Sequence, residues 1–449
     1  MSTHFYRKAN SQYTIVDSLQ DSLRFTTRRC LTTYNGNLCA ASTFVDPNGE
    51  PAKWHEFGEL EGVGWAANIV GGAYEILWYA RIFHDPRMNA IGVSLLHHAL
   101  EGGFFQDNGF VTPYRDIATD KRSLNYMHNP KFENWFCPGS TAHIALQLLW
   151  ASDEVGEPLR SRLQQTALRT ADWLKQRVKP CANGWYPRRL KPDGSHANYN
   201  AWGDSPDSQF DHSGDGVYLL WLWVELTRRG YRDYRDEIRR AAEAYRDIGG
   251  AFGSINHDTY DDHENVAYSV GFRCITRAAN LLRDTALYEW ALSNCLHGLE
   301  QFEMHEDRNG VVTRGLLYME KSWDTSYLWE DAEAALAYFE AAAASRIRSY
   351  ELKGLTILRT AALHHHGEHG FLTEGVDWNN HNGQFRKVKG ENIPIHVDGA
   401  KHGDVNYTQP FLNNMHICAP TLYYLENLAR KFHDSDALHY FDCEENRLA

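Results

Sequence analysis

Val217-Tyr-Leu-Leu-Trp-Leu-Trp-Val224 is a run of apolar residues that leaves no side of a helix for water. A helix without a polar face is stable only where other elements cover it on every side. This run directly follows residues 200–216, a polar stretch rich in Asp, Ser and Gly. The change from a polar loop to a dry helix predicts the fold, because it recurs along the chain.

The same change occurs six times. Each polar stretch is dense in Trp, Asp, Glu, His and Asn, and each runs into an apolar helical segment. The six polar stretches are residues 54–66, 125–135, 200–216, 256–269, 318–331 and 404–416. Six helices that begin in this way predict a ring of helices with a polar, aromatic pocket at one mouth.

Two kinds of helix alternate in the sequence. Residues 158–177 place Leu159, Leu163 and Leu174 on one face and arginines on the other, which is typical of an outer helix with one wet side. The outer helices are expected near residues 14–30, 88–101, 158–177, 235–249, 285–303 and 350–363. The inner, dry helices are expected near residues 66–84, 139–152, 215–229, 266–283, 330–345 and 412–430.

Three outer helices are followed by an Asn-Gly pair. Asn108-Gly109, Asn183-Gly184 and Asn309-Gly310 supply the positive φ of a tight turn, so short β-hairpins are expected on the rim of the ring. The longest irregular stretch, about 367–409, is expected to form a rim loop or lid. Without a linker of low complexity, the chain is expected to be one domain over residues 1–449.

Composition narrows the classes of partner. The formal net charge of -13 disfavours nucleic acid and anionic lipid, and no run of 18 apolar residues predicts a membrane span. The eight Cys residues show no CxxC pair, which favours reduced, mostly buried thiols. The first residues lack the apolar core of a signal peptide, so a cytoplasmic location is expected. The sequence gives no oligomeric state.

The repeated helical pairs, the Asn-Gly turns after outer helices and the loops rich in Trp and acids before inner helices carry a resemblance. They resemble the (α/α)6-barrel, or six-hairpin, superfamily of carbohydrate-active enzymes over nearly the whole chain. The superfamily includes glycosidases, unsaturated glucuronyl hydrolases, sugar 2-epimerases and the toroid domains of polysaccharide lyases. The resemblance implies an all-α fold and a small oligosaccharide substrate. It matches no single family.

Acids and aromatic side chains share the predicted loops. Hydrolysis of a glycosidic bond needs one carboxyl to protonate the leaving oxygen and another to activate water or stabilise the transition state. Asp204, Asp262 and Asp324 are the preferred candidates, because each lies near Trp or Tyr that could hold a sugar ring. The alternative for each acid is an ordinary helix N-cap. The residues expected to bind substrate are Trp65, Asn129, Asn134, Trp135, Trp202, Trp323, Trp329, Glu330 and Asn406, and Trp202, Trp323 and Trp329 are expected to be partly exposed.

A second set of residues suits a lyase. Polysaccharide lyases neutralise a uronate with Asn or His and abstract a proton with His or Tyr, and His128, His212 and Tyr268 are the candidate bases. For any one of them the alternative is a hydrogen bond between loops. The run His364-His-His366 lacks the i, i+4 spacing of a helical zinc pair, so a solvated tract is expected and no metal. No phosphate-binding glycine loop is present, and no cofactor is expected.

The leading hypothesis from the sequence is a glycosidase that acts on an oligosaccharide, with uronic-acid-containing oligosaccharides among the candidate substrates. The alternatives are a lyase, and a sugar epimerase or isomerase on the same barrel. A non-catalytic sugar-binding toroid is a hypothesis from a different class. We rank it lower because titratable groups gather on one rim.

Overall fold

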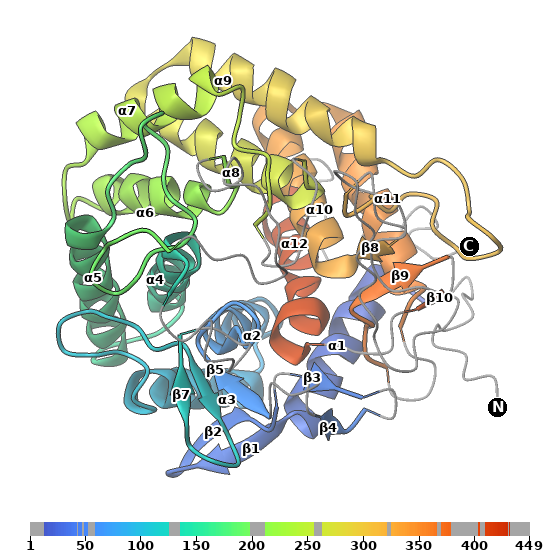
Figure 1. Ribbon diagram of the computed structural model, residues 1–449. Helices are drawn as coiled ribbons and strands as arrows, with labels where there is room; N and C mark the ends of the chain where they lie inside the picture. Colours follow the sequence, from blue (N-terminus) through green and yellow to red (C-terminus); the bar gives the residue numbers. More distant parts are fainter. Residues whose placement is uncertain are drawn as a thin grey trace.

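The computed structural model describes residues 13–42, 44–46, 49–52, 59–124, 135–197, 212–255, 263–320, 325–365, 370–378, 403–404, 409–429 and 431. Within these residues the chain forms an inner ring of helices surrounded by a second layer (Figure 1). The inner helices are α2 (Ile69–Phe83), α4 (Pro138–Asp153), α6 (Gly216–Arg228), α8 (Asn265–Leu282), α10 (Leu328–Ser345) and α12 (Cys418–Tyr423), the last flanked by the π-helical segments η5 (Pro410–Asn414) and η6 (Tyr424–Ala429).

The outer layer alternates with the inner ring along the chain. Its members are α1 (Ile15–Arg29), α3 (Pro86–Glu101), α5 (Leu159–Arg177), α7 (Arg235–Asp247), α9 (Thr285–Ala291), continued by η3 (Leu292–Leu296) and η4 (His297–Phe302), and α11 (Arg348–Ala362). All twelve helices lie where the alternation predicts them, within a few residues. The all-α (α/α)6-barrel fold expected from the sequence is therefore confirmed.

The inner helices pack in sequence order, and α12 packs against both α10 and α2, which closes the ring. Ion pairs join their C-terminal ends: Arg81, near the end of α2, binds Glu154 and Glu426, and Arg229 binds Asp153. The ends of α2, α4 and α6 therefore share one face with η6. We call this end of the barrel the C-terminal mouth, and the end where the inner helices begin the loop mouth.

Side-chain patterning explains the two layers. In α6 every residue from Gly216 to Thr227 is buried, as expected for a helix covered on all sides. In α7 only Ile238, Ala241, Ala242, Ala244 and Tyr245 are buried, and its charged face is exposed to solvent. One hydrophobic cluster runs from α1 to η6. That the whole chain forms a single domain remains a prediction.

Short strands lie between the helices. They form four small antiparallel sheets, which are β1 (Leu31–Tyr34) with β2 (Asn37–Ala40), β3 (Phe44–Val45) with β4 (Pro51–Ala52), β5 (Leu60–Gly62) with β6 (Tyr114–Asp116) and β7 (Arg122–Ser123), and β8 (Thr325–Tyr327) with β9 (Gly375–Asp377) and β10 (Gly403–Asp404). The Asn108-Gly109 and Asn309-Gly310 turns each close a single antiparallel bridge. The expected hairpins there are therefore tight turns with minimal ladders.

Two further expectations can be compared with the structure. Six of the seven cysteines in the described part of the chain are buried, which confirms that the thiols are mostly buried. The first two residues of the histidine run are not solvated, however, and His366 lies outside the described residues. His364 and His365 are buried, with His364 at 2.7 Å from the Val312 carbonyl oxygen and His365 at 2.6 Å from Ser18 Oγ. These bonds tie the end of α11 to the rim and to α1.

No helix within the described ranges is long and apolar enough to cross a membrane.

The close approach of α4 and α6 generates a prediction about stability. A Cβ built on Gly139, in the first turn of α4, would lie 2.2 Å from the backbone oxygen of Asp215, which cannot move without shifting α6. We expect Gly139→Ala to lower the free energy of unfolding by about 1–3 kcal/mol, although Ala favours helix. The measurement is denaturant unfolding followed by circular dichroism.

The matched control is Gly156→Ala, because no atom lies within 4 Å of that added Cβ. Its effect should stay within ~0.5 kcal/mol. Equal stability of the two variants would contradict the close contact between the inner helices.

Candidate functional site

The structure describes only some of the residues that the sequence predicted for the site. Asp204, Asp262, Asp324, His128, Asn129, Asn134, Trp202, Trp323 and Asn406 lie outside the described residues, and their assignment stays a prediction. His212 is exposed just before α6. Trp135 is buried, with the Arg189 guanidinium 5.2 Å from its ring centre.

Three of the predicted residues meet at the loop mouth. The rings of Trp65 and Trp329 pack edge to face with their centres 5.6 Å apart, and Glu330 accepts a hydrogen bond of 2.8 Å from Asn265 Nδ2. Trp329 is only 3% exposed, so the expectation that it is partly exposed is wrong. The ring of Trp65 packs against Trp329, and Trp65 is the half-buried member of the pair.

Tyr268 faces the outer layer. Its ring stacks on Phe252 with centres 3.8 Å apart, packs edge to face on Phe302 and lies against Gly298. Its hydroxyl lies 2.5 Å from His263 Nδ1, and burial raises the pKa of Tyr268 to about 12. Tyr268 therefore packs between α8 and its outer neighbours, apart from the residues that line the barrel axis.

The axis of the barrel carries a polar layer that sequence reasoning missed. Five inner helices each contribute one side chain to it, and the segment before the sixth contributes another. The six are Glu75 from α2, His143 from α4, Tyr218 from α6, Arg273 from α8, Glu333 from α10 and His416 from the segment before α12. All six are buried. We call this set the axial layer.

The centre of the axial layer is an imidazole between two carboxylates. His416 Nε2 lies at a hydrogen-bond distance of 2.7 Å from Glu333 Oε1, whereas His416 Nδ1 lies 3.3 Å from Glu75 Oε1 in an ion-pair contact without hydrogen-bond geometry. Arg273 binds Glu333 from the other side and also donates to Glu340 Oε1 at 3.0 Å. The second oxygen of Glu75, Oε2, is buried and has no hydrogen-bond partner among the described residues.

The surroundings separate the pKa values of these groups. Burial raises the pKa of Glu75 to about 7, although His416 partly offsets it. Burial also opposes ionisation of Glu333 and His416, but their partners outweigh it. Arg273 and His416 hold the pKa of Glu333 well below its usual range, and the two carboxylates raise the pKa of His416 to about 10. Near neutral pH the layer therefore holds an imidazolium on His416, an ionised Glu333 and a partly protonated Glu75.

His143 completes the layer as a neutral imidazole. Burial lowers the pKa of His143 to about 3, and its ring stacks on Tyr218 with centres 4.3 Å apart. The layer thus offers a cationic and a neutral histidine within one cavity of about 280 Å³. Its volume is close to the lower end of the range for small-molecule sites, which is roughly 300–1,000 Å³.

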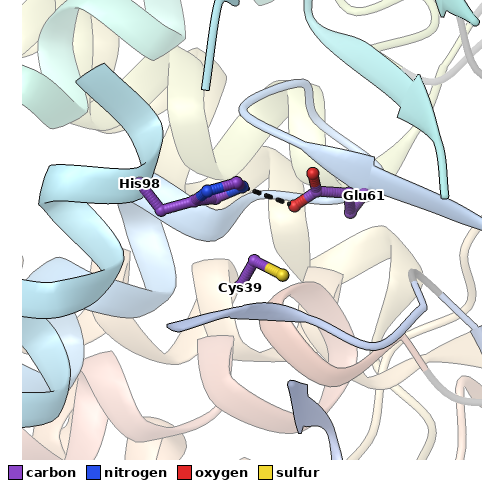
Figure 2. A group of neighbouring side chains, drawn as sticks. All are labelled: Cys39, Glu61 and His98. Atoms are coloured by element: carbon purple, nitrogen blue, oxygen red, sulfur yellow. Dashed lines mark hydrogen bonds and ion pairs between the residues drawn. The ribbon is translucent and has the colours of Figure 1, made fainter. Parts of the chain in front are cut away.

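A second buried cluster lies outside the barrel axis. Cys39 Sγ, a carboxylate oxygen of Glu61 and a ring nitrogen of His98 lie within 4.8 Å of one another, and Figure 2 shows the three side chains converging. Arg115 Nε donates to Glu61 Oε1 at 2.6 Å, and His98 Nε2 lies 2.8 Å from Glu61 Oε2. Burial raises the pKa of the Cys39 thiol to about 12. Since Arg115 already neutralises Glu61, this cluster fits a buried ion pair that ties α3 to the β5–β6 sheet.

The axial residues had a weak signal in the sequence. Glu75, Arg273 and Glu333 are charged residues that stand among apolar neighbours inside largely apolar helices, as in Ser269-Val-Gly-Phe-Arg-Cys274. A buried charge is costly unless it is paired, so a lone charge in such a helix indicates partners on neighbouring helices. The sequence does not reveal which helices supply them.

No protein-family model matches this sequence, and no curated protein matches it either. Solved structures do match. A cellobiose 2-epimerase from Bacillus thermoamylovorans B4167 is 11% identical with a TM-score of 0.59, covering 91% of this chain and 98% of that one. A D-mannose isomerase is 13% identical with a TM-score of 0.57, covering 92% and 97%. A family 76 glycoside hydrolase from a bovine Bacteroides thetaiotaomicron strain is 10% identical with a TM-score of 0.52, covering 91% and 78%.

At these identities the likeness concerns the fold. It shows that the chain has the (α/α)6-barrel architecture used by known sugar-processing enzymes, and it assigns no single family among them.

Proposed function

We propose that this protein is a sugar epimerase or isomerase, which moves a proton at the carbon beside the carbonyl of a reducing sugar. The observation that carries the proposal is the axial layer, in which His416 is fixed between Glu75 and Glu333. Among the hypotheses from the sequence this was an alternative, and the geometry of the barrel axis favours it over the glycosidase.

Proton transfer beside a carbonyl needs a base whose pKa is near the working pH. Glu75 has this property because burial raises its pKa to about 7, and its Oε2 has no partner among the described residues. In the open-chain sugar, that oxygen would take the proton from C2 while the C2–H electrons form the double bond of an enediolate. The carbonyl oxygen would then carry the negative charge.

An enediolate needs positive charge or donors in a dry site. His416 remains an imidazolium near neutral pH, and Arg273 adds a second cation within the same layer. Rotation of the enediolate in the site would let the protonated Glu75 return its proton to the opposite face of C2, which gives the epimer. Return of the proton to C1, with transfer of the O2 hydroxyl proton to O1, gives the ketose. Neutral His143 could donate to a sugar hydroxyl without adding charge.

The second candidate is the glycosidase that the sequence favoured. The split between a carboxyl with pKa about 7 on Glu75 and an ionised Glu333 suits a general acid and its partner. However, the His416 ring lies between the two carboxyls, in the space that a glycosidic bond would need. Asp204, Asp262 and Asp324 remain candidates for this activity, as His128 and His212 do for the lyase.

A product assay separates the candidates. We expect incubation with mannose or cellobiose in D2O to yield an epimer carrying deuterium at C2 or a ketose carrying deuterium at C1, observed by NMR, because the abstracted proton exchanges with solvent. These two sugars are the first to test, since matching structures are named for them. An increase in reducing ends would instead support a glycosidase, and absorbance of an unsaturated uronate a lyase.

The role of Glu75 can be tested by substitution. We expect Glu75→Gln to lower kcat by ~10²–10⁴, the loss associated with removing a general base. The control is Glu351→Gln, which removes a buried carboxylate paired with Arg348 outside the barrel axis. Normal turnover in a folded Glu75→Gln protein would contradict the assignment.

The two raised pKa values also predict the pH profile. Glu75 must lose its proton to act as a base, so kcat/KM should rise as the pH passes through about 7. His416 must keep its proton, so activity should fall as the pH passes through about 10. In Glu75→Asp the rising limb should move while the falling limb persists. A flat profile from pH 6 to 8 would argue against Glu75.

A further inference from the structure

Five of the six axial-layer residues line one cavity, and this cavity opens toward the end of the barrel where the inner helices end. Of the residues that line it, Glu75, His143, Arg273, Glu333 and His416 are buried. Asn427 is exposed, and the half-buried lining residues are Tyr74, Trp150, Arg277, Glu340 and Tyr423. Four of these five come from the second half of an inner helix or from α12. The solvent-exposed end of the cavity is therefore at the C-terminal mouth.

Aromatic rings form one wall of this end. Tyr74 lies between Trp78 and Trp150, with ring centres 5.6 and 6.1 Å apart, and Trp150 packs edge to face on Trp221 at 5.4 Å. Tyr423 lines the same cavity from α12. Flat aromatic faces suit the apolar C–H faces of a sugar ring, and their rigid side chains lose little entropy on binding.

The charged groups at this end already neutralise one another. Arg277 donates to both oxygens of Glu340, at 2.7 and 2.8 Å, and its guanidinium lies 4.6 Å from the Trp221 ring centre. Arg273 shares Glu340 at 3.0 Å. A ligand here meets aromatic faces and hydrogen-bonding edges, and the described residues that line this end leave no unpaired cation to bind a uronate or phosphate. The site therefore suits an uncharged sugar.

We propose that the C-terminal mouth is the substrate entrance and forms a second sugar subsite, which holds an uncharged ring linked to the reducing sugar at the axial layer. This rests on the proposed function only for the position of the reacting ring. Binding at the mouth is a separate property that can be measured without turnover. The substrate class is accordingly an uncharged disaccharide or longer oligosaccharide.

The test blocks the mouth without altering the packed interior. Asn427→Trp places a large side chain on an exposed residue that lines the cavity, and Leu352→Trp places it on α11, where Leu352 is 44% exposed. Calorimetric titration with cellobiose should show an affinity at least about tenfold lower for Asn427→Trp and unchanged for Leu352→Trp. A second variant, Tyr423→Ala, should raise KM for cellobiose by about tenfold and leave KM for mannose unchanged.

The opposite mouth supplies the decisive comparison. Trp65 is half-buried at the loop mouth, so Trp65→Ala should leave cellobiose affinity unchanged. Loss of affinity in Trp65→Ala, with normal affinity in Asn427→Trp, would overturn the proposal and place the entrance among the loops. If Asn427→Trp weakens binding but neither the wild type nor any variant incorporates deuterium at C1 or C2, the subsite stands and the proposed isomerase fails.

Discussion

The imidazolium of His416 between Glu75 and Glu333 is the interaction on which the centre of this barrel depends. Six dry helices meet along the axis, and polar groups brought there can reach few partners except one another. Burying an ion costs several kcal/mol, which only pairing offsets. The carboxyl groups that line the cavity are Glu75, Glu333 and Glu340, and its cationic side chains are Arg273, Arg277 and His416. With His416 and all three acids ionised, their charges cancel.

This mutual dependence has a chemical consequence. Because Arg273 and His416 act mainly on Glu333, the pKa of Glu333 falls while burial raises that of Glu75. Two carboxyls in one cavity thus differ in protonation, which is what acid–base chemistry needs. A buried ion network is also poor evidence for stability, since packed apolar side chains often replace one without loss. The proposed function therefore rests on the acid–base chemistry of the axial layer and not on its contribution to stability.

The fold could be predicted from the sequence more completely than the site. Helix α6 follows from Val217–Val224 alone, since such a run has one stable environment, and Asn309 takes the positive φ expected of an Asn-Gly turn. The site differs because the presence of Arg273 in a largely apolar helix does not show which side chains of the neighbouring helices face it. The histidines at 364 and 365 show the same limit, because their partners, Val312 and Ser18, come from distant segments.

The two mouths of the barrel also differ in the charge they favour. Helix N-termini carry partial positive charge and C-termini partial negative charge, so the loop mouth favours anions and the C-terminal mouth disfavours them. Arg81 lies at the C-terminal mouth but is bound by Glu154 and Glu426, which leaves the local charge balanced or negative. A uronate-bearing substrate, considered from the sequence, would therefore fit the loop mouth. An uncharged oligosaccharide meets no such electrostatic penalty at the C-terminal mouth, so the choice of entrance and the charge of the substrate are linked.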